Sequence, residues 1–307
     1  MDAAAIDPDR IVYGWHTHGF VILSAHLRPE WLTPAVEQLG TMFPSADGFH
    51  DRTDPRWSRF DGDEWAGINS FPFSAVEVSL LAVSDPVLRL AELLLGGPDL
   101  RMYSAEAWAK FTGAADYDQP LHRNYLNHTL VVPTRARGYR QLELFVYLVD
   151  VPEELGPPHL LSRTYTEDVP ARPNWFPGAD VDSSDDDFDS PIGRPDLYAE
   201  ETSGAGPAGT VVAFETGTFH RGTALRAPRG ARYSMHLSFR PAEVEWGQRA
   251  AWADRSHGPA WYDFVSRASP RQLELFGFPP PGHPYWTPET LDGVALRYRG
   301  LDLTPWR

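Results

Sequence analysis

Five segments between residues 100 and 240 alternate apolar and polar side chains, and this pattern restricts the fold more than any other feature of the chain. Successive side chains of a β-strand point to opposite faces, so alternation predicts strands with one buried face. Helix-like spacing of apolar residues occurs on both sides of this region. The sequence therefore predicts a mainly β sandwich or barrel that is braced by flanking helices. The predicted strands cover residues 100–111, 126–133, 141–151, 209–215 and 231–240.

Helices are expected at residues 29–42, 85–95, 259–276 and 287–298. The helix at 85–95 has the clearest limits, because Asp85 is suited to cap its N-terminus, Pro86 fits the first turn and Gly96 ends it. The helix at 287–298 begins with the sequence TPET, which has a capping-box pattern. Residues 11–23 end in a short strand-like run. Residues 47–69 have no periodicity and are expected to form a loop.

A long segment rich in Pro, Asp and Ser, residues 169–206, interrupts the predicted strands. Such a length without periodicity is typical of a functional lid or of a solvated loop. Its aromatic residues allow two interpretations, since they either close over a substrate or anchor the loop to the rest of the protein. These residues are Trp175, Phe176, Phe188 and Tyr198. Because no repeat or linker divides the chain, we expect residues 1–307 to form a single domain.

The formal net charge of −15 argues against nucleic acid and against an anionic membrane surface as partners, because both bind basic proteins. No apolar run is long enough to span a bilayer, and the first ten residues lack the pattern of a secretion signal. The absence of cysteine excludes disulfides and thiolate chemistry. We therefore expect a cytoplasmic protein that acts on a small molecule. The sequence gives no indication of the oligomeric state.

Residues 116–130 (DYDQPLHRNYLNHTL) contain the first candidate metal ligands. His122 and Asn124 are two residues apart, so on an extended strand their side chains project to the same face. His220, shortly after the predicted strand at 209–215, is the best distant partner. Two histidines and one oxygen ligand, with adjacent positions left open, form the ligand set of non-heme iron oxygenases. The pattern therefore predicts a catalytic metal centre at His122, Asn124 and His220.

Arg232 and Ser234 indicate a site for an anion beside this centre. They share one face of the predicted strand at 231–240, as does His236. An arginine with a neighbouring hydroxyl is suited to bind one end of a dicarboxylate, such as a chelating 2-oxo acid. Arg226 and Arg229 are alternative cations, but they lie in a turn that contains Gly and Pro and are expected to face solvent.

In their order along the chain, the segments GFVIL, HRNYLNHTL, FHRGT and ARYSMHLSFRP resemble the phytanoyl-CoA dioxygenase family. The resemblance extends from residue 11 to residue 240 and implies a double-stranded β-helix, which is a cupin-like jelly roll. It also implies an Fe(II) ion and 2-oxoglutarate as cosubstrate. His122 and His220 match the iron-binding histidines of the family, and Arg232 matches the arginine that binds the distal carboxylate of 2-oxoglutarate. Lys110 is similar in position to a lysine near the cosubstrate.

The family pattern has an aspartate where this chain has Asn124. Hard divalent cations prefer carboxylates to amides, so metal affinity should fall and the metal centre should be one charge more positive. Several interpretations remain open. In the first, Asn124 is a weak ligand of a working oxygenase, and in the second, metal binding is lost. In the third, the residue was introduced artificially, and in the fourth, the carboxylate ligand comes from Asp116, Asp118 or Glu215 instead. Related halogenases have a small residue at this position; because Asn is as large as Asp, hydroxylation is favoured over halogenation.

Two functions follow from these patterns. The first is an Fe(II)- and 2-oxoglutarate-dependent dioxygenase, an oxidoreductase that by default hydroxylates a small organic substrate. The second is a metal-deficient pseudoenzyme or small-molecule binding protein on the same fold. Among the other histidines, His128 is expected to be a hydrogen-bonded strand residue and His159 a turn residue near the pocket.

Overall fold

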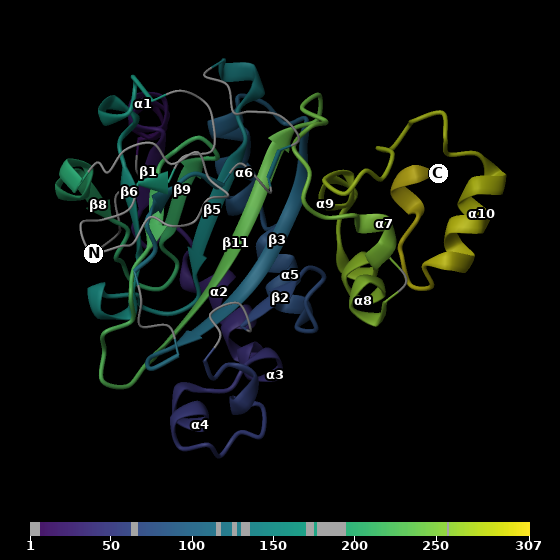
Figure 1. The fold of residues 1–307 in the computed structure, drawn as a ribbon. Coiled ribbons are helices and arrows are strands. Elements are labelled where there is room, and N and C mark those ends of the chain that lie inside the picture. The colour runs from purple at the N-terminus through teal and green to yellow at the C-terminus, as the bar shows by residue number, and fades with distance from the viewer. Residues whose placement is uncertain are drawn as a thin grey trace.

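Two antiparallel sheets form the centre of the structure (Figure 1). The structure is a computed structural model that describes residues 7–62, 67–114, 118–124, 128–129, 136–169, 175–176, 195–256 and 258–307. The larger sheet has the order β1 (Phe20–Leu23), β9 (Val211–Glu215), β5 (Leu142–Tyr147), β11 (Ala231–Pro241), β3 (Leu100–Phe111) and β2 (Ile68–Ser70). The smaller sheet has the order β7 (Trp175–Phe176), β4 (Leu121–His122), β10 (His220–Gly222), β6 (Pro158–Leu161) and β8 (Glu201–Ser203).

Strand β11 lies at the centre of the larger sheet, between β3 and β5. Its alternating side chains separate two environments, as the sequence pattern predicts. One set belongs to the main hydrophobic core: Tyr233, Met235, Leu237 and Phe239. The other set is also buried but polar: Arg232, Ser234, His236 and Ser238. The polar face of β11 therefore lies on the side of the sheet away from that core.

The helices contribute to the hydrophobic core on the face of the larger sheet that carries the apolar residues of β11. In the N-terminal part they are α1 (Pro8–His18), α2 (Pro29–Glu37), α3 (Leu39–Met42), α4 (Ala46–His50), α5 (Val76–Ala82) and α6 (Asp85–Leu95). Helices α7 (Trp252–Arg255), α8 (Pro259–Arg267), α9 (Pro270–Glu274) and α10 (Pro288–Arg297) follow β11 and lie together beside the β3 edge (Figure 1). Met102 of β3 ties this group to the sheet, because its N–H donates to Leu275 O and its carbonyl accepts from Trp252 Nε1. None of the described helices is long and apolar enough to cross a membrane.

Short 3₁₀ turns connect these elements. They are η1 (Trp57–Arg59), η3 (Arg137–Tyr139), η4 (Glu153–Leu155), η5 (Arg163–Tyr165), η6 (Pro195–Glu200) and η7 (Thr304–Trp306). Strand β1 of the larger sheet follows α1 directly after Gly19, which caps the helix with a positive φ of 81°. A side chain at Gly19 would also collide with Thr218 and Arg163, so both the turn and the packing require glycine.

Several predicted boundaries are wrong, while the element types are mostly confirmed. Helices α1, α4, α5 and α7 were not expected, and the first two lie in segments without clear periodicity. Ser84, rather than Asp85, is the N-cap of α6, although Gly96 ends the helix in the left-handed conformation as predicted. The capping box of α10 is confirmed at Thr287. Of the strand expected at 126–133, only His128 and Thr129 are described, and neither belongs to a strand.

The C-terminal part of the 169–206 segment is not a loop. Residues of β8 pair with β6, so this part completes the smaller sheet. Tyr198 of η6 accepts a hydrogen bond from Leu121 N at 3.1 Å through its hydroxyl, which favours the anchoring interpretation for this aromatic residue. The backbone of β7 pairs with β4. Phe188 lies outside the described residues.

Candidate active site

His122 and His220 lie side by side on neighbouring strands. They are direct partners in the register of β4 and β10, and their ring centroids are 4.7 Å apart. Both residues are at least nine-tenths buried. The two strands come from segments about a hundred residues apart in sequence, and the antiparallel pairing of the smaller sheet brings them together.

The hydrogen bonds of both rings fix the same tautomer. His122 Nδ1 donates to Pro120 O at 2.8 Å, and His220 Nδ1 donates to Thr218 O at 3.0 Å. Each Nε2 therefore carries a lone pair, as a metal ligand requires. Burial lowers the pKa of His122, and burial together with the neighbouring His122 lowers the pKa of His220 well below its usual value. Both imidazoles are thus neutral around pH 7.

Asn124 completes this group, although not in the predicted way. It follows β4 in a helical turn instead of continuing the strand, so strand alternation is not what places it. Its side chain nevertheless forms a hydrogen bond with His122. Within the described parts of the chain, no three His, Asp or Glu side chains are grouped so that they could hold a metal ion. The arrangement therefore consists of two imidazoles and one amide.

The alternative carboxylates that are described bind elsewhere. Asp118 accepts hydrogen bonds from Ala224 N and Arg226, and Glu215 forms ion pairs with Arg140 and Arg163. The proposal that either one replaces the missing aspartate is therefore wrong for this structure. Asp116 lies outside the described residues.

Lys110 and Arg232 form the basic end of a cavity of about 90 Å³ that both histidines and Asn124 also line. The two residues are partners in the register of β3 and β11, and both are more than nine-tenths buried. Ser234, fully buried, follows on the same face of β11. The structure thus brings all six predicted site residues into one region. Arg226 and Arg229 instead pair with acidic residues at the surface, as expected.

Glu143, which no sequence pattern singles out, is the centre of a polar cluster near the other end of the cavity. Its completely buried carboxylate accepts hydrogen bonds from Tyr103, Ser238 and Thr216. His128 Nδ1 lies 2.8 Å from one of its oxygens, and His236 Nε2 lies 2.9 Å from the other. Burial alone would raise the pKa of Glu143, but the two histidines hold this pKa well below its usual value. Glu143 is therefore ionised, although its side chain is completely buried.

Arg249, which also lines the cavity, contacts this cluster. Its Nη1 lies 2.8 Å from His128 Nε2, and its Nη2 lies 3.2 Å from Glu106 Oε1. Because a guanidinium can only donate, His128 Nε2 accepts this bond and His128 is neutral. Burial, which lowers the pKa of His128, agrees with this state. His128 is hydrogen-bonded, as expected, and it also lines the cavity, which was not predicted.

Comparison with solved structures finds the same fold in two proteins whose structures contain 2-oxoglutarate, one of them together with iron. The epimerase SnoN, solved with Fe3+, alpha ketoglutarate and nogalamycin RO, has a TM-score of 0.54 and 19% identity over 76% of this chain and 84% of its own. EctD from S. alaskensis, solved with 2-oxoglutarate and 5-hydroxyectoine, has a TM-score of 0.53 and 15% identity over 80% and 79% of the two chains. This chain has their fold. No family model and no curated protein sequence matches it.

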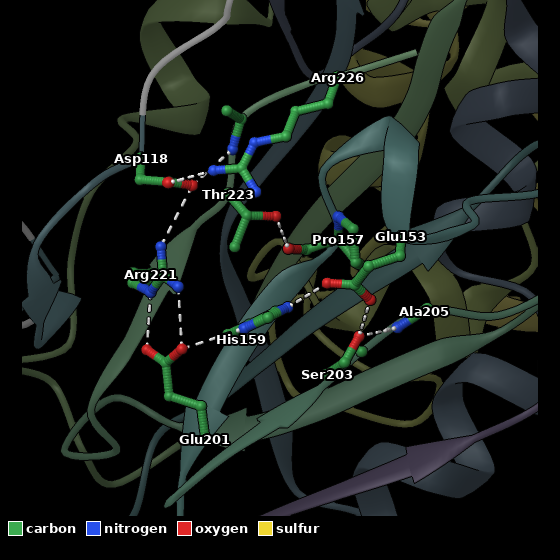
Figure 2. A network of polar contacts seen from close by, with 12 residues as sticks. Asp118, Glu153, Pro157, His159, Glu201, Ser203, Ala205, Arg221, Thr223 and Arg226 are labelled. Atoms are coloured by element: carbon green, nitrogen blue, oxygen red, sulfur yellow. Dashed lines mark hydrogen bonds and ion pairs between the residues drawn. The ribbon is translucent and has the colours of Figure 1, made fainter. Parts of the chain in front are cut away.

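A second polar network connects the strands of the smaller sheet, outside the set of cavity-lining residues (Figure 2). Arg221, the neighbour of His220 in β10, binds Glu201 of β8 through two hydrogen bonds and lies 3.2 Å from Asp118. His159 of β6 lies between two carboxylates, with Nδ1 at 3.0 Å from Glu201 and Nε2 at 2.6 Å from Glu153. His159 is therefore a strand residue of this network, and the expected turn role near the pocket is wrong.

This network predicts a pH dependence of stability. The hydrogen bond with Glu201, followed by that with Glu153, raises the pKa of His159 above 6.5. The protonated imidazole therefore stabilises the fold below pH 6.5, and this contribution is lost as the pH rises through the raised pKa. We expect wild-type protein to lose about 2 kcal/mol more than the His159→Gln variant between pH 6 and pH 9, in urea unfolding.

The control for this measurement is His16→Gln. Burial and neighbouring arginines lower the pKa of His16, so its removal should act in the opposite direction, and the His16→Gln variant should lose at least as much stability as the wild type between pH 6 and pH 9. Equal slopes for wild type and His159→Gln would contradict a protonated His159.

Proposed function

We propose that the protein is an Fe(II)- and 2-oxoglutarate-dependent oxygenase of the phytanoyl-CoA dioxygenase type, with a double-stranded β-helix as its fold. Residues 1–307 form a single domain in this proposal. The observation that carries it is the pair His122 and His220, two neutral imidazoles whose Nδ1 atoms donate to backbone carbonyls and whose ring centroids are 4.7 Å apart. The basic residues at one end of the same cavity support an anionic cosubstrate.

Each residue has a definite part in this proposal. His122 and His220 hold the iron, with the amide oxygen of Asn124 as a weaker third ligand. Arg232 binds the distal carboxylate of 2-oxoglutarate, while Ser234 and Lys110 contribute a hydroxyl and a second positive charge. When bound, iron and 2-oxoglutarate supply the activation of dioxygen for oxidation of a C–H bond. The buried, aromatic walls exclude water from this site, and hydroxylation of a small organic molecule is the default outcome.

Asn124 favours a second candidate, a binding protein on the same fold that has lost its metal. No three His, Asp or Glu side chains among the described residues are grouped so that they could hold a metal ion, and a neutral donor set holds Fe(II) less tightly. This candidate predicts a pocket that still binds a small molecule but does not turn over 2-oxoglutarate.

An anaerobic titration distinguishes the two candidates. Adding Fe(II) and 2-oxoglutarate to the oxygenase should produce the weak visible charge-transfer band of the chelate, and admitting oxygen should then produce succinate. Replacing Arg232 with Ala should weaken 2-oxoglutarate binding by about 30- to 150-fold, because a charge-assisted contact contributes about 2–3 kcal/mol.

Arg226→Ala is the matched control, since Arg226 is exposed and pairs with Asp118 at the surface. It should leave the band and its 2-oxoglutarate dependence unchanged. Absence of the band and of succinate in wild-type protein would exclude the oxygenase and leave the binding protein.

A further inference from the structure

His236 presents an unsatisfied nitrogen at the cavity. The residue is about 95% buried and lines the same cavity as His122 and His220. Its Nε2 faces Glu143, and its Nδ1 has no hydrogen-bond partner among the described residues. A buried polar atom without a partner costs about 1–3 kcal/mol, so its persistence beside a cavity indicates that a ligand satisfies it.

The position of His236 separates it from the proposed cosubstrate site. Arg232 and His236 are four residues apart on one face of β11, which places their backbones about 13 Å apart along the strand. Arg232 is 5% exposed, whereas the Arg249 side chain near the His236 end is 23% exposed. Arg249, at the His236 end, is therefore the more exposed of the two arginines that line the cavity.

The charges and walls of this end restrict the ligand chemistry. The fixed charges near this end are the carboxylates of Glu106 and Glu143, the guanidinium of Arg249 and the ammonium of Lys110, which lies 5.4 Å from the centre of the Trp108 ring. Because the two negative and two positive charges balance, a neutral ligand is favoured over an anion. Phe145 stacks on His236 with ring centroids 4.4 Å apart, and Trp108 lies edge-on to it. The whole cavity has a volume of about 90 Å³, so only a small ring or chain can enter this end of it.

We propose that His236 binds the primary substrate, and that this substrate is a neutral molecule whose hydroxyl donates to His236 Nδ1. The same hydroxyl oxygen accepts from Arg249, while the attached ring or chain packs against Phe145 and Trp108. This inference rests on the proposed function, which assigns the Arg232 end to 2-oxoglutarate. Glu143 acts through His236, because its contact with Nε2 orients the ring so that Nδ1 faces the ligand.

The test uses metal-free protein without 2-oxoglutarate and two probes of equal shape, phenol and toluene. Their dissociation constants are measured by NMR titration for wild type and for His236→Phe, which keeps the aromatic packing but removes the acceptor. We expect the preference for phenol over toluene to fall about fivefold in the variant, as loss of one hydrogen bond predicts. An unchanged preference would overturn the proposal.

A measurement on wild-type protein covers the case in which the variant does not fold. With ¹⁵N-labelled histidine, phenol should shift the His236 Nδ1 resonance and toluene should not. His26 is the matched control, because its Nε2 also lacks a partner among the described residues but the residue does not line the cavity. Its resonance should not move, and the His26→Phe variant should keep the probe preference. A response of His26 equal to that of His236 would overturn the assignment.

The two proposals fail independently. If the iron chelate forms but the preference for phenol does not depend on His236, the proposed oxygenase function stands and the substrate site at His236 is rejected. Probe binding that depends on His236, without any chelate band, would instead identify the protein as a binding module for hydroxylated molecules.

Discussion

Replacing Asn124 with Asp is expected to raise the affinity for Fe(II) at least about tenfold. The variant adds a carboxylate in a group that already contains two neutral imidazoles, and hard divalent cations prefer charged oxygen ligands. Even groups that only contact a metal ligand change affinity by about 10- to 100-fold, so a direct ligand should change it by no less. Anaerobic titration with Fe(II), followed by competition with a chelator of known strength, measures the effect.

The matched control for Asn124→Asp is Gln119→Glu. Gln119 lines the same cavity, and its Oε1 accepts a hydrogen bond from Gly222 N that a carboxylate retains. This control adds an equal charge to the cavity without adding a ligand, so it should raise Fe(II) affinity much less. If both variants gave the same increase, position 124 would act through charge alone and would not be a metal ligand.

The second large effect is expected for Glu143→Ala, which should lower the free energy of unfolding by about 3–5 kcal/mol. The substitution removes the shared acceptor of a buried cluster and leaves Tyr103, Ser238 and His128 without their partner. The thermal midpoint should fall by roughly 5–15 °C. Urea and thermal unfolding at pH 7 measure both quantities.

The Glu143→Gln variant tests how much the negative charge contributes to stability, because it removes the charge but keeps the size of the side chain. The amide has the same size and keeps one acceptor, so this variant should be more stable than Glu143→Ala and less stable than wild type. Glu77→Ala provides a surface comparison, because the Glu77 carboxylate pairs with the exposed Arg267. A loss from Glu143→Ala no larger than that from Glu77→Ala would show that the cluster does not stabilise the fold.

Much of the strand region could be predicted because alternation is a local property of the sequence. Strands β3, β5, β9 and β11 lie within the predicted segments, since each buries an apolar face against the helices. The strands of the smaller sheet are short and were harder to recognise. Strand β8, for example, exists through its pairing with β6 and not through any pattern of its own. Helix α1 was missed because only Ile11 and Trp15 are buried, which leaves a weak periodic signal.

The candidate site could be predicted where the motif residues themselves carry the chemistry. His122, His220 and Arg232 were identified from spacing and resemblance, and all three lie at one cavity. Glu143 was missed because a glutamate within an alternating strand is indistinguishable from a solvent-facing residue. The signal that was available was its position beside the apolar Leu142 and Leu144 in the sequence QLELF. Only the three-dimensional pairing of β5 with β11 places Glu143 opposite Ser238 and beside two histidines.

The two faces of β11 have a consequence for how such a chain can diversify. Positions 233, 235, 237 and 239 contribute to the hydrophobic core, and positions 232, 234, 236 and 238 contribute to the polar interior. A point substitution at an even position therefore changes the groups available to a ligand without altering core volume. A one-residue insertion would exchange the two sets and disrupt both. Descendants of this chain can thus acquire new ligand preferences by replacement within β11, whereas changes in its length would be eliminated.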